Sequence, residues 1–169
     1  MAAGEDLLPM LDALEDHDAV SLTPVERMLL ATDGTVTHML EALTRGHVEV
    51  DILDRTVEGA TLTRRVALRR DVDGSVLTWA RSEVNTYPLS MEVEEALVSG
   101  DKGIGDVLRE KYAEQRREII GMGVAWSDDD DLPRFIDDGS TLYLRRTYKV
   151  YSDDTNVMKI IEYFPKGLF

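Results

Sequence analysis

The chain has 169 residues, of which 43% are hydrophobic, and it contains no cysteine. This length and composition are typical of one globular domain spanning residues 1–169, and the lack of cysteine excludes disulfides, thiol catalysis and cysteine-ligated zinc. The 33 Asp and Glu residues outnumber the 19 Lys and Arg residues and give a net charge of −14, which argues against binding to nucleic acid.

Other bulk features bear on where the protein is located. The sequence has no run of about twenty apolar residues, so it predicts no membrane-spanning helix. Residues 1–11 lack the basic and long apolar regions of a signal peptide. We therefore expect a cytoplasmic protein with no membrane partner. A surface rich in carboxylates and poor in lysine also fits a halophilic host with a salt-rich cytoplasm, although an ordinary acidic protein has the same composition.

The N-terminal part of the chain is predicted to form three helices. Residues 5–17 (EDLLPMLDALEDH) carry leucines at helical spacing. Residues 23–26 (TPVE) are a capping box with proline at the first helical position, and they start a helix that runs to about residue 32. The DGT sequence at 33–35 interrupts it, and a third helix opens at residue 35 or 36 and stops at Gly46.

A half-buried strand and a hairpin are expected next. Apolar and charged residues alternate in 47–57 (HVEVDILDRTV), as in a strand with one buried face. Two β-type runs then flank the turn Asp71–Gly74, which predicts a hairpin over 61–86. With a turn of two or four residues, one face carries Arg64, Val66, Leu68, Leu77, Trp79 and Arg81, and the other carries Arg65, Ala67, Arg69, Thr78, Ala80 and Ser82. A turn of three or five residues would change this sorting.

The two arginines on the apolar face of this hairpin need a counter-charge. With a four-residue turn, Arg64 and Arg81 lie directly opposite each other, and like charges on facing strands repel. A buried charge also requires a partner. We therefore expect an anion beside the pair, either a carboxylate of the protein or a ligand. The two side chains could bind a ligand carboxylate through their guanidinium forks, or pair with Glu83 and with helix carboxylates.

The C-terminal half is predicted to contain two helices and three strands. Residues 91–99 form a helix that stops at Gly100, and the turn 102–105 (KGIG) opens a longer helix over 106–118. Residues 117–126 resemble a strand, 127–131 and 137–139 are loops, and 142–151 with 157–165 form a second hairpin. The whole pattern favours an α+β fold: a single six-stranded antiparallel sheet with helices packed on one face.

Glu162 is the carboxylate with the most unusual predicted surroundings. It shares a strand face with Met158, Ile160 and Phe164, so it is expected to be partly withdrawn from water. It could act as a general base or accept a hydrogen bond from a substrate. Alternatively, it could form a salt bridge with Arg145 or Arg146 across the second hairpin.

Two glycine-containing turns precede predicted helices. Gly103-Ile104-Gly105 and the segment 33–36, which ends at Val36, could each present free backbone N–H groups to an anion, although most such turns are only turns. The histidines show no metal-ligand spacing, and the acidic run 128–131 lacks the calcium-loop pattern, so no metal site is predicted.

Four segments carry a resemblance to a known family. They are LLATDGTVTHMLEAL at 29–43, RRVALRRDVDGSVLTWARSEV at 64–84, GIGDVLRE at 103–110 and LRRTYKVYSDDTNVMKIIEYFP at 144–165. In order and spacing the chain resembles the chorismate pyruvate-lyase (4-hydroxybenzoate synthase) family, in its compact archaeal-type branch. The resemblance implies a chorismate lyase-like fold of six antiparallel strands covered by helices.

The resemblance also implies a reaction and a set of site residues. The substrate would be chorismate or a related enolpyruvyl carboxylate, and elimination of pyruvate would give 4-hydroxybenzoate without a metal or cofactor. Arg64 and Glu162 would be the catalytic residues. Substrate binding would involve Arg64, Arg81 and Glu162 and the backbone near Ile104 and Val36. The alternative is a non-catalytic small-molecule sensor, because bacterial transcription regulators use the same fold to bind effectors behind a DNA-binding domain, for which this chain has no room.

Overall fold

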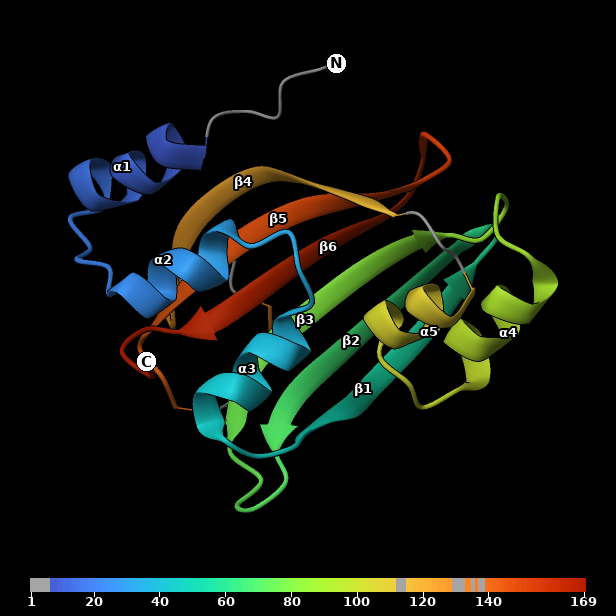
Figure 1. The fold of residues 1–169 in the computed structure, drawn as a ribbon, viewed down its shortest axis with the longest axis horizontal. Coiled ribbons are helices and arrows are strands. Elements are labelled where there is room, and N and C mark those ends of the chain that lie inside the picture. The colour runs from blue at the N-terminus through green and yellow to red at the C-terminus, as the bar shows by residue number, and fades with distance from the viewer. Residues whose placement is uncertain (1–6, 112–114, 129–132, 135, 137–138) are drawn as a thin grey trace.

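The structure, a computed structural model, describes residues 7–111, 115–128, 133, 134, 136 and 139–169. Its strands are β1 (Val48–Glu58), β2 (Thr61–Arg70), β3 (Val76–Asn85), β4 (Arg116–Trp126), β5 (Leu142–Ser152) and β6 (Thr155–Pro165). Its helices are α1 (Leu7–His17), α2 (Pro24–Ala31), α3 (Val36–Thr44), α4 (Met91–Ser99) and α5 (Ile104–Lys111). The strands form one antiparallel sheet in the order β1-β2-β3-β6-β5-β4 (Figure 1), so the predicted α+β class is confirmed.

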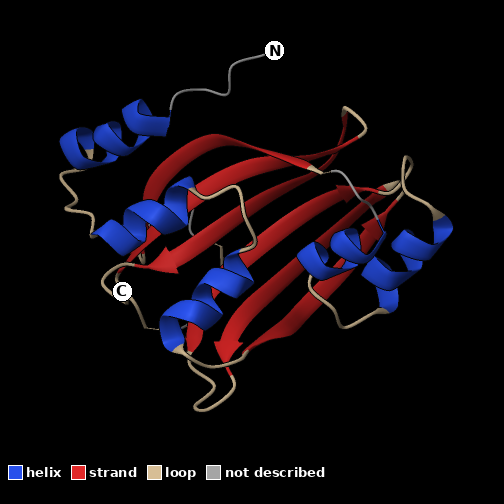
Figure 2. Ribbon diagram, viewed as in Figure 1, coloured by secondary structure: helices blue, strands red, loops and turns tan. Residues whose placement is uncertain are grey.

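The described helices lie on one side of the sheet (Figure 2). α4 and α5 pack against each other as one helix pair. α2 and α3, joined by the short connection 32–35, form the other pair and pack against β5 and β1 respectively, and α1 packs against β4 at the edge. None of these helices, within the described ranges, is long and apolar enough to cross a membrane. The helix pairs bury two apolar clusters against the sheet, and a smaller cluster around Trp79 and Tyr143 lies on the other face.

Local capping chemistry sets the helix boundaries. At α2 the Thr23 hydroxyl accepts the Glu26 N–H while the Glu26 carboxylate accepts the Thr23 N–H, which confirms the predicted capping box. At α4 the Ser90 hydroxyl accepts the Val93 N–H as a single N-cap bond. The end of α3 differs slightly from the prediction, because Arg45, with a φ of 54°, takes the left-handed position that was expected at Gly46.

The first hairpin contains a β-bulge that the sequence analysis did not foresee. Of the turn lengths that the sequence left open, the four-residue turn is present, since Arg70 donates its N–H to the Ser75 carbonyl at 3.0 Å across Asp71–Gly74. The pairing then shifts at Leu77, which enters as one extra residue of β3 between two successive pairs. These pairs are Arg69 with Val76 and Leu68 with Thr78. A bulge of this kind moves every residue beyond it by one position, and therefore to the opposite face.

The bulge separates the two arginines that were predicted to share a face. Arg64 pairs with Ser82, and Arg65 pairs with Arg81. Arg64 therefore faces the helices, and Arg81 lies on the other side of the sheet, where it forms an ion pair with Glu83 at 3.0 Å. The prediction of one face carrying both Arg64 and Arg81 is wrong for this reason, and Ala80 and Ser82 take the helix-facing positions instead.

A second difference concerns residues 106–118, which were predicted as one long helix. α5 begins earlier, at Ile104 within the predicted turn, and ends at Lys111. Residues 112–114 lie outside the described residues, and β4 already starts at Arg116. Arg117 is therefore a strand residue, and it pairs with Val150 of β5.

The second hairpin agrees with the prediction. Asp153 and Asp154, with φ values of 47° and 60°, form the tight turn between β5 and β6. Glu162 lies opposite Arg146, on a face with the buried residues Met158, Ile160 and Phe164. The loops predicted at 127–131 and 137–139 fall mostly outside the described residues.

Candidate functional site

A cavity lies between the sheet and the two helix pairs. Its walls come from the helix-facing side chains of the strands and from the first turns of α3 and α5. The empty space between these walls is about 730 Å³, and part of it is open to solvent. Small residues leave this room: Ala80 and Ser82 on the central strand β3, and Gly103 and Gly105 on the opposite wall.

Arg64 brings an unneutralised positive charge to the cavity. Its side chain is 1% exposed, and its Nη2 donates to the Lys102 carbonyl at 2.9 Å. Its Nε and Nη1 have no hydrogen-bond partner among the described residues. Burial, and then the neighbouring charge of Arg55, lower the pKa of Arg64 to about 10, so it stays cationic at neutral pH. A buried cation with free donors is the arrangement expected for an anion-binding position.

Two helix N-termini face the same cavity without a capping side chain of their own. Thr35, at the N-cap of α3, makes no side-chain cap, and its hydroxyl accepts from Arg109 Nη2 at 3.0 Å instead. α5 follows Gly103, which has no side chain to cap it. Val36 and Ile104, the first residues of the two helices, both line the cavity. Free N–H groups at a helix N-terminus favour a negative charge.

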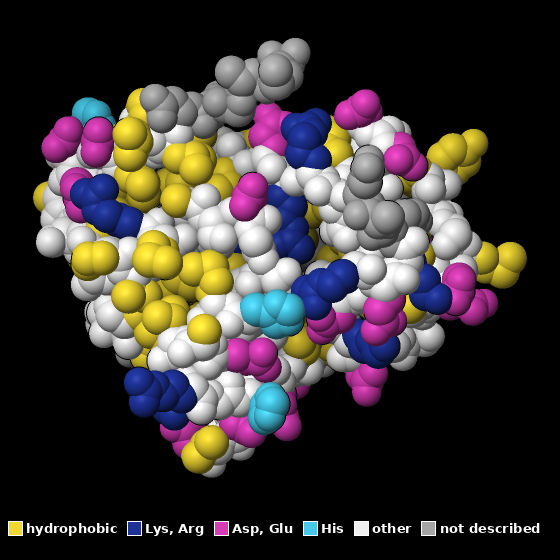
Figure 3. Space-filling model, viewed as in Figure 1, with side chains coloured by type: hydrophobic (Ala, Val, Ile, Leu, Met, Phe, Trp, Pro, Cys, Tyr) yellow, Lys and Arg dark blue, Asp and Glu magenta, His cyan; other side chains and the backbone are white. Residues whose placement is uncertain are grey.

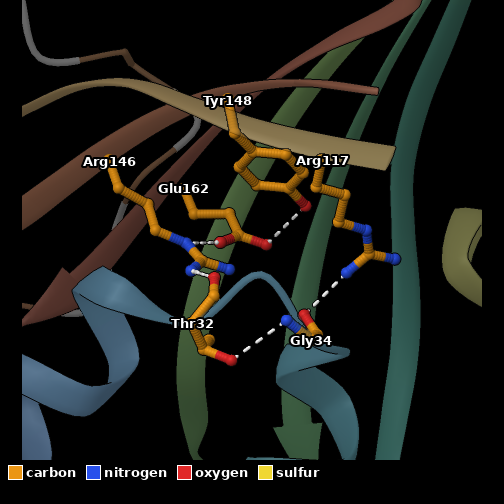
Figure 4. A network of polar contacts seen from close by, with 6 residues as sticks. All are labelled: Thr32, Gly34, Arg117, Arg146, Tyr148 and Glu162. Carbon is orange, nitrogen blue, oxygen red and sulfur yellow. Dashed lines mark hydrogen bonds and ion pairs between the residues drawn. The ribbon is translucent and has the colours of Figure 1, made fainter. Parts of the chain in front are cut away.

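Glu162 is held in a buried network at the other side of the cavity (Figure 4). Its Oε2 accepts from Arg146 Nε at 2.5 Å, and its Oε1 accepts from the Tyr148 hydroxyl at 3.2 Å. The salt bridge with Arg146, one of the two alternatives for Glu162, is therefore confirmed. Burial and then the Glu162 charge raise the pKa of Tyr148, so that its hydroxyl remains a donor.

Two arginines tie the α2–α3 connection to this network. Arg146 Nη1 donates to the Thr32 carbonyl and Arg117 Nη1 donates to the Gly34 carbonyl, each at 2.6 Å. Figure 4 shows them reaching from adjacent strands to the same connection. The Tyr148 ring lies 5.0 Å from the Arg146 guanidinium and 5.9 Å from that of Arg117.

A second, more polar hollow adjoins the cavity. Thr35, Gly105 and Arg117 line both spaces, and Arg109 and Arg116 line only the hollow. Figure 3 shows Lys and Arg side chains at the centre of this face, between the helices. Although the whole chain carries a net charge of −14, the surroundings of the cavity are thus rich in arginine.

The structure brings together four of the five residues that the sequence singled out. Arg64, Val36, Ile104 and Glu162 all line the cavity, whereas Arg81 does not. The residues that the sequence analysis missed are Arg117 and Tyr148. Tyr148 has the same strand alternation as Arg146, so it could have been found on the face of Glu162. Arg117 stands where the predicted helix 106–118 and the predicted strand 117–126 overlap, so the sequence assigned its side chain to no face.

The geometry suits a planar molecule with an anionic end and a hydroxyl end. Arg64 lies on β2 and Glu162 on β6, two strands away, which is roughly 10 Å across the sheet. Along the strand direction Glu162 is two residues beyond Ile160, the residue level with Arg64. A ring that spans this gap could place a carboxylate at Arg64 and the two helix N-termini. Its hydroxyl could then donate to Glu162. Val66, Val150 and Ile160 would contact the ring faces.

Comparison with known proteins gives three informative matches. Residues 30–169 match the family model described as "Chorismate pyruvate-lyase Rv2949c-like". A protein of Methanocaldococcus jannaschii with the name "Putative lyase MJ0807" is 32% identical over 144 residues, covering 82% of this chain and 77% of its own. The effector domain of PhnF from Mycobacterium smegmatis superimposes with a TM-score of 0.56 at 12% identity, covering 80% of this chain and 90% of that domain, and this shows a shared fold.

Proposed function

Because the chain belongs to the Rv2949c-like chorismate pyruvate-lyase family and has its chorismate lyase-like fold, we propose that it is a lyase that eliminates pyruvate from chorismate to give 4-hydroxybenzoate. In this reaction the ring loses one proton and the bond to its enolpyruvyl ether oxygen breaks. The leaving enolpyruvate takes up a proton and becomes pyruvate. The ring becomes aromatic, which drives the elimination, so the proposal requires no metal and no redox cofactor.

The observation that carries the proposal is the buried, unpartnered charge of Arg64 beside two uncapped helix N-termini. We assign the ring carboxylate of the substrate to this position, held by the guanidinium and by the N–H groups at Val36 and Ile104. The ring hydroxyl donates to Glu162, which the hydrogen bonds from Arg146 and Tyr148 hold in position. Catalysis then comes from orientation and from fixed charges in the cavity, and Glu162 is the group placed to assist proton removal.

The test is incubation of the purified protein with chorismate while 4-hydroxybenzoate and pyruvate are measured. We expect the two products in equal amounts, with no loss of rate in EDTA. Arg64→Met should abolish turnover while leaving the fold intact, because it replaces the buried charge with an apolar side chain of similar length. Glu162→Gln should depress turnover more than it weakens 4-hydroxybenzoate binding.

Arg81→Gln is the matched control for Arg64, because it removes an arginine of the same hairpin from the opposite face. Its turnover should stay within about twofold of the wild-type value. A wild-type protein that binds 4-hydroxybenzoate but forms no pyruvate would contradict the lyase proposal and favour a small-molecule sensor. Near-normal turnover in Arg64→Met would contradict the assignment of the site.

A further inference from the structure

The cavity holds a second cationic side chain that the roles assigned above leave unused. Among the described residues that line it, only Arg64 and Arg117 are cationic. Arg64 is enclosed, whereas Arg117 is partly exposed and also lines the adjoining hollow. One guanidinium therefore belongs to the interior of the cavity and the other to its opening.

The Arg117 guanidinium has N–H donors that remain available for a ligand. Its Nη1 donates to the Gly34 carbonyl, and its Nη2 lies 3.6 Å from the position that a Cβ of Gly105 would take. No ion pair within the described part of the chain involves Arg117. A guanidinium has five N–H donors, so one contact with a carbonyl leaves most of them available. Because Gly105 has no side chain, nothing at that position stands between Arg117 and the start of α5.

Chorismate carries two carboxylates, one on the ring and one on the enolpyruvyl side chain. Arg64 and the two helix N-termini are assigned to the ring carboxylate. Arg81, the other arginine that the sequence suggested, lies on the far face of the sheet with Glu83. Building on the proposed function, we propose that Arg117 binds the enolpyruvyl carboxylate and so makes the site selective for dicarboxylates. The ring then lies in the cavity with its side chain directed to the opening.

This placement separates the roles of the two arginines. Arg64 holds a group that substrate and aromatic product share, so its loss weakens the binding of both. Arg117 holds a group that leaves with pyruvate, so its loss affects only ligands that carry the second carboxylate. A purely structural role of Arg117, as the anchor of the α2–α3 connection through Gly34, would instead weaken all ligands alike.

The experiment compares two unreactive aromatic ligands of matched size, 3-(carboxymethoxy)-4-hydroxybenzoate and 3-ethoxy-4-hydroxybenzoate. Calorimetry should show that the wild-type protein prefers the dicarboxylate. Arg117→Gln should weaken the binding of the dicarboxylate roughly tenfold to a hundredfold and that of the ethoxy compound less than about threefold. Arg117→Lys should restore part of the preference, because it restores the charge without the planar fork. Arg81→Gln, which removes the same charge from the opposite face, should leave both affinities unchanged.

Equal losses for both ligands in Arg117→Gln would overturn the inference, and so would a wild-type protein with no preference for the dicarboxylate. Since neither ligand can react, these results are independent of turnover. If chorismate is bound but not converted while the selectivity depends on Arg117, the lyase proposal fails and the binding inference stands. If chorismate is converted while Arg117→Gln keeps the wild-type preference, only the inference about Arg117 fails.

Discussion

Arg64 is a costly residue for the fold, because it carries a charge into the cavity wall with only a carbonyl as partner. Proteins seldom bury a lone charge unless something pairs with it, so the ligand is its natural counter-ion. Glu162 is the opposite case, since Arg146 and Tyr148 already satisfy it. The unliganded site is therefore charge-balanced on the β6 side and cationic on the β2 side.

The lowered pKa of Arg64 gives a pH prediction. Burial disfavours its charged form, so the proton that binds a carboxylate is lost as the pH rises through about 10 rather than through the ordinary value of 12.5. The affinity for 4-methoxybenzoate, whose charge is constant over this range, should be flat to about pH 9 and then fall by up to about tenfold per pH unit above about 10. Isothermal titration calorimetry between pH 7 and about 11 measures this.

The same lowered pKa changes the stability of the fold with pH in the opposite direction to the affinity. Between the two pKa values of Arg64 the unfolded chain binds a proton that the folded chain does not, so this group makes the folded state more stable as the pH rises. A fall in affinity with an unchanged circular dichroism spectrum would therefore show that Arg64 loses its proton in a folded protein. Arg64→Lys should move the fall to lower pH, because the ordinary pKa of lysine is only about 10.4. A constant affinity up to pH 11 would refute the prediction.

Strand alternation and the family resemblance together identify residues that bring a buried side chain or a backbone contact to the cavity. Arg64, Glu162, Val36 and Ile104 lie at one cavity for these reasons, and their part in binding stays a prediction. Arg117 was missed because it lies where the predicted helix 106–118 overlaps the predicted strand 117–126, so no face could be assigned to its side chain. Three-residue and four-residue spacings do not reveal where a short helix ends when no proline or glycine marks the position.

At the scale of elements, each helix pair is fixed to the sheet by two arginines that donate to carbonyls of its connection. Arg146 and Arg117 hold the α2–α3 connection at Thr32 and Gly34. Arg55 and Arg64 hold the α4–α5 connection. Arg55 donates to the Val98 carbonyl at 2.8 Å and to that of Gly100, and Arg64 donates to that of Lys102. Each connection leads directly into one of the two helix N-termini at the cavity.

Arg55→Met should therefore loosen the α4–α5 pair. The variant removes two charged donors from carbonyls at the end of α4, each worth about 1.5–3 kcal/mol, so amides in residues 91–111 should exchange at least roughly tenfold faster. Hydrogen exchange followed by mass spectrometry measures this. The amides of α2 and α3 provide an internal reference that should not change.

Arg70→Met is the matched control, because the Arg70 side chain pairs with Asp73 in the exposed β2–β3 turn, away from α4 and α5. It should leave exchange in 91–111 unaltered. Protection of α4 and α5 that is equal in Arg55→Met and in the wild type would show that packing around Leu97 and Leu108, rather than Arg55, holds this pair.

The β-bulge at Leu77 marks the limit of what a single sequence predicts at this scale. The turn Asp71–Gly74 was predicted from its residues, since aspartate and glycine favour those backbone angles. The bulge has no such signature, because Leu77 is an ordinary strand residue. One inserted position was enough to exchange Arg81 for Ser82 at the cavity. The site thus depends on register, which is set by tertiary packing.

At the scale of the whole molecule, charge is distributed unevenly. The chain has 33 acidic and 19 basic residues, yet Arg64, Arg117 and Arg146 gather around one cavity. Many other arginines form exposed pairs, such as Arg65 with Asp54 and Arg69 with Asp51. Exposed pairs contribute little to stability, so the excess negative charge acts mainly as repulsion within the folded state.

This repulsion predicts that salt stabilises the protein. The screening length falls from about 10 Å at 0.1 M to about 3 Å at 1 M, which removes most repulsion between surface carboxylates. The free energy of unfolding in urea should rise from 0.1 M to 1 M KCl. A protein adapted to a salt-rich cytoplasm should continue to gain stability above 1 M, whereas an ordinary acidic protein should reach a plateau once screening is complete.

Because Arg64 is 1% exposed, the affinity for 4-methoxybenzoate should change far less than the free energy of unfolding over the same range of KCl concentration. Stability that is independent of KCl would contradict the charge argument, and a large loss of affinity would mean that Arg64 is reached by solvent ions.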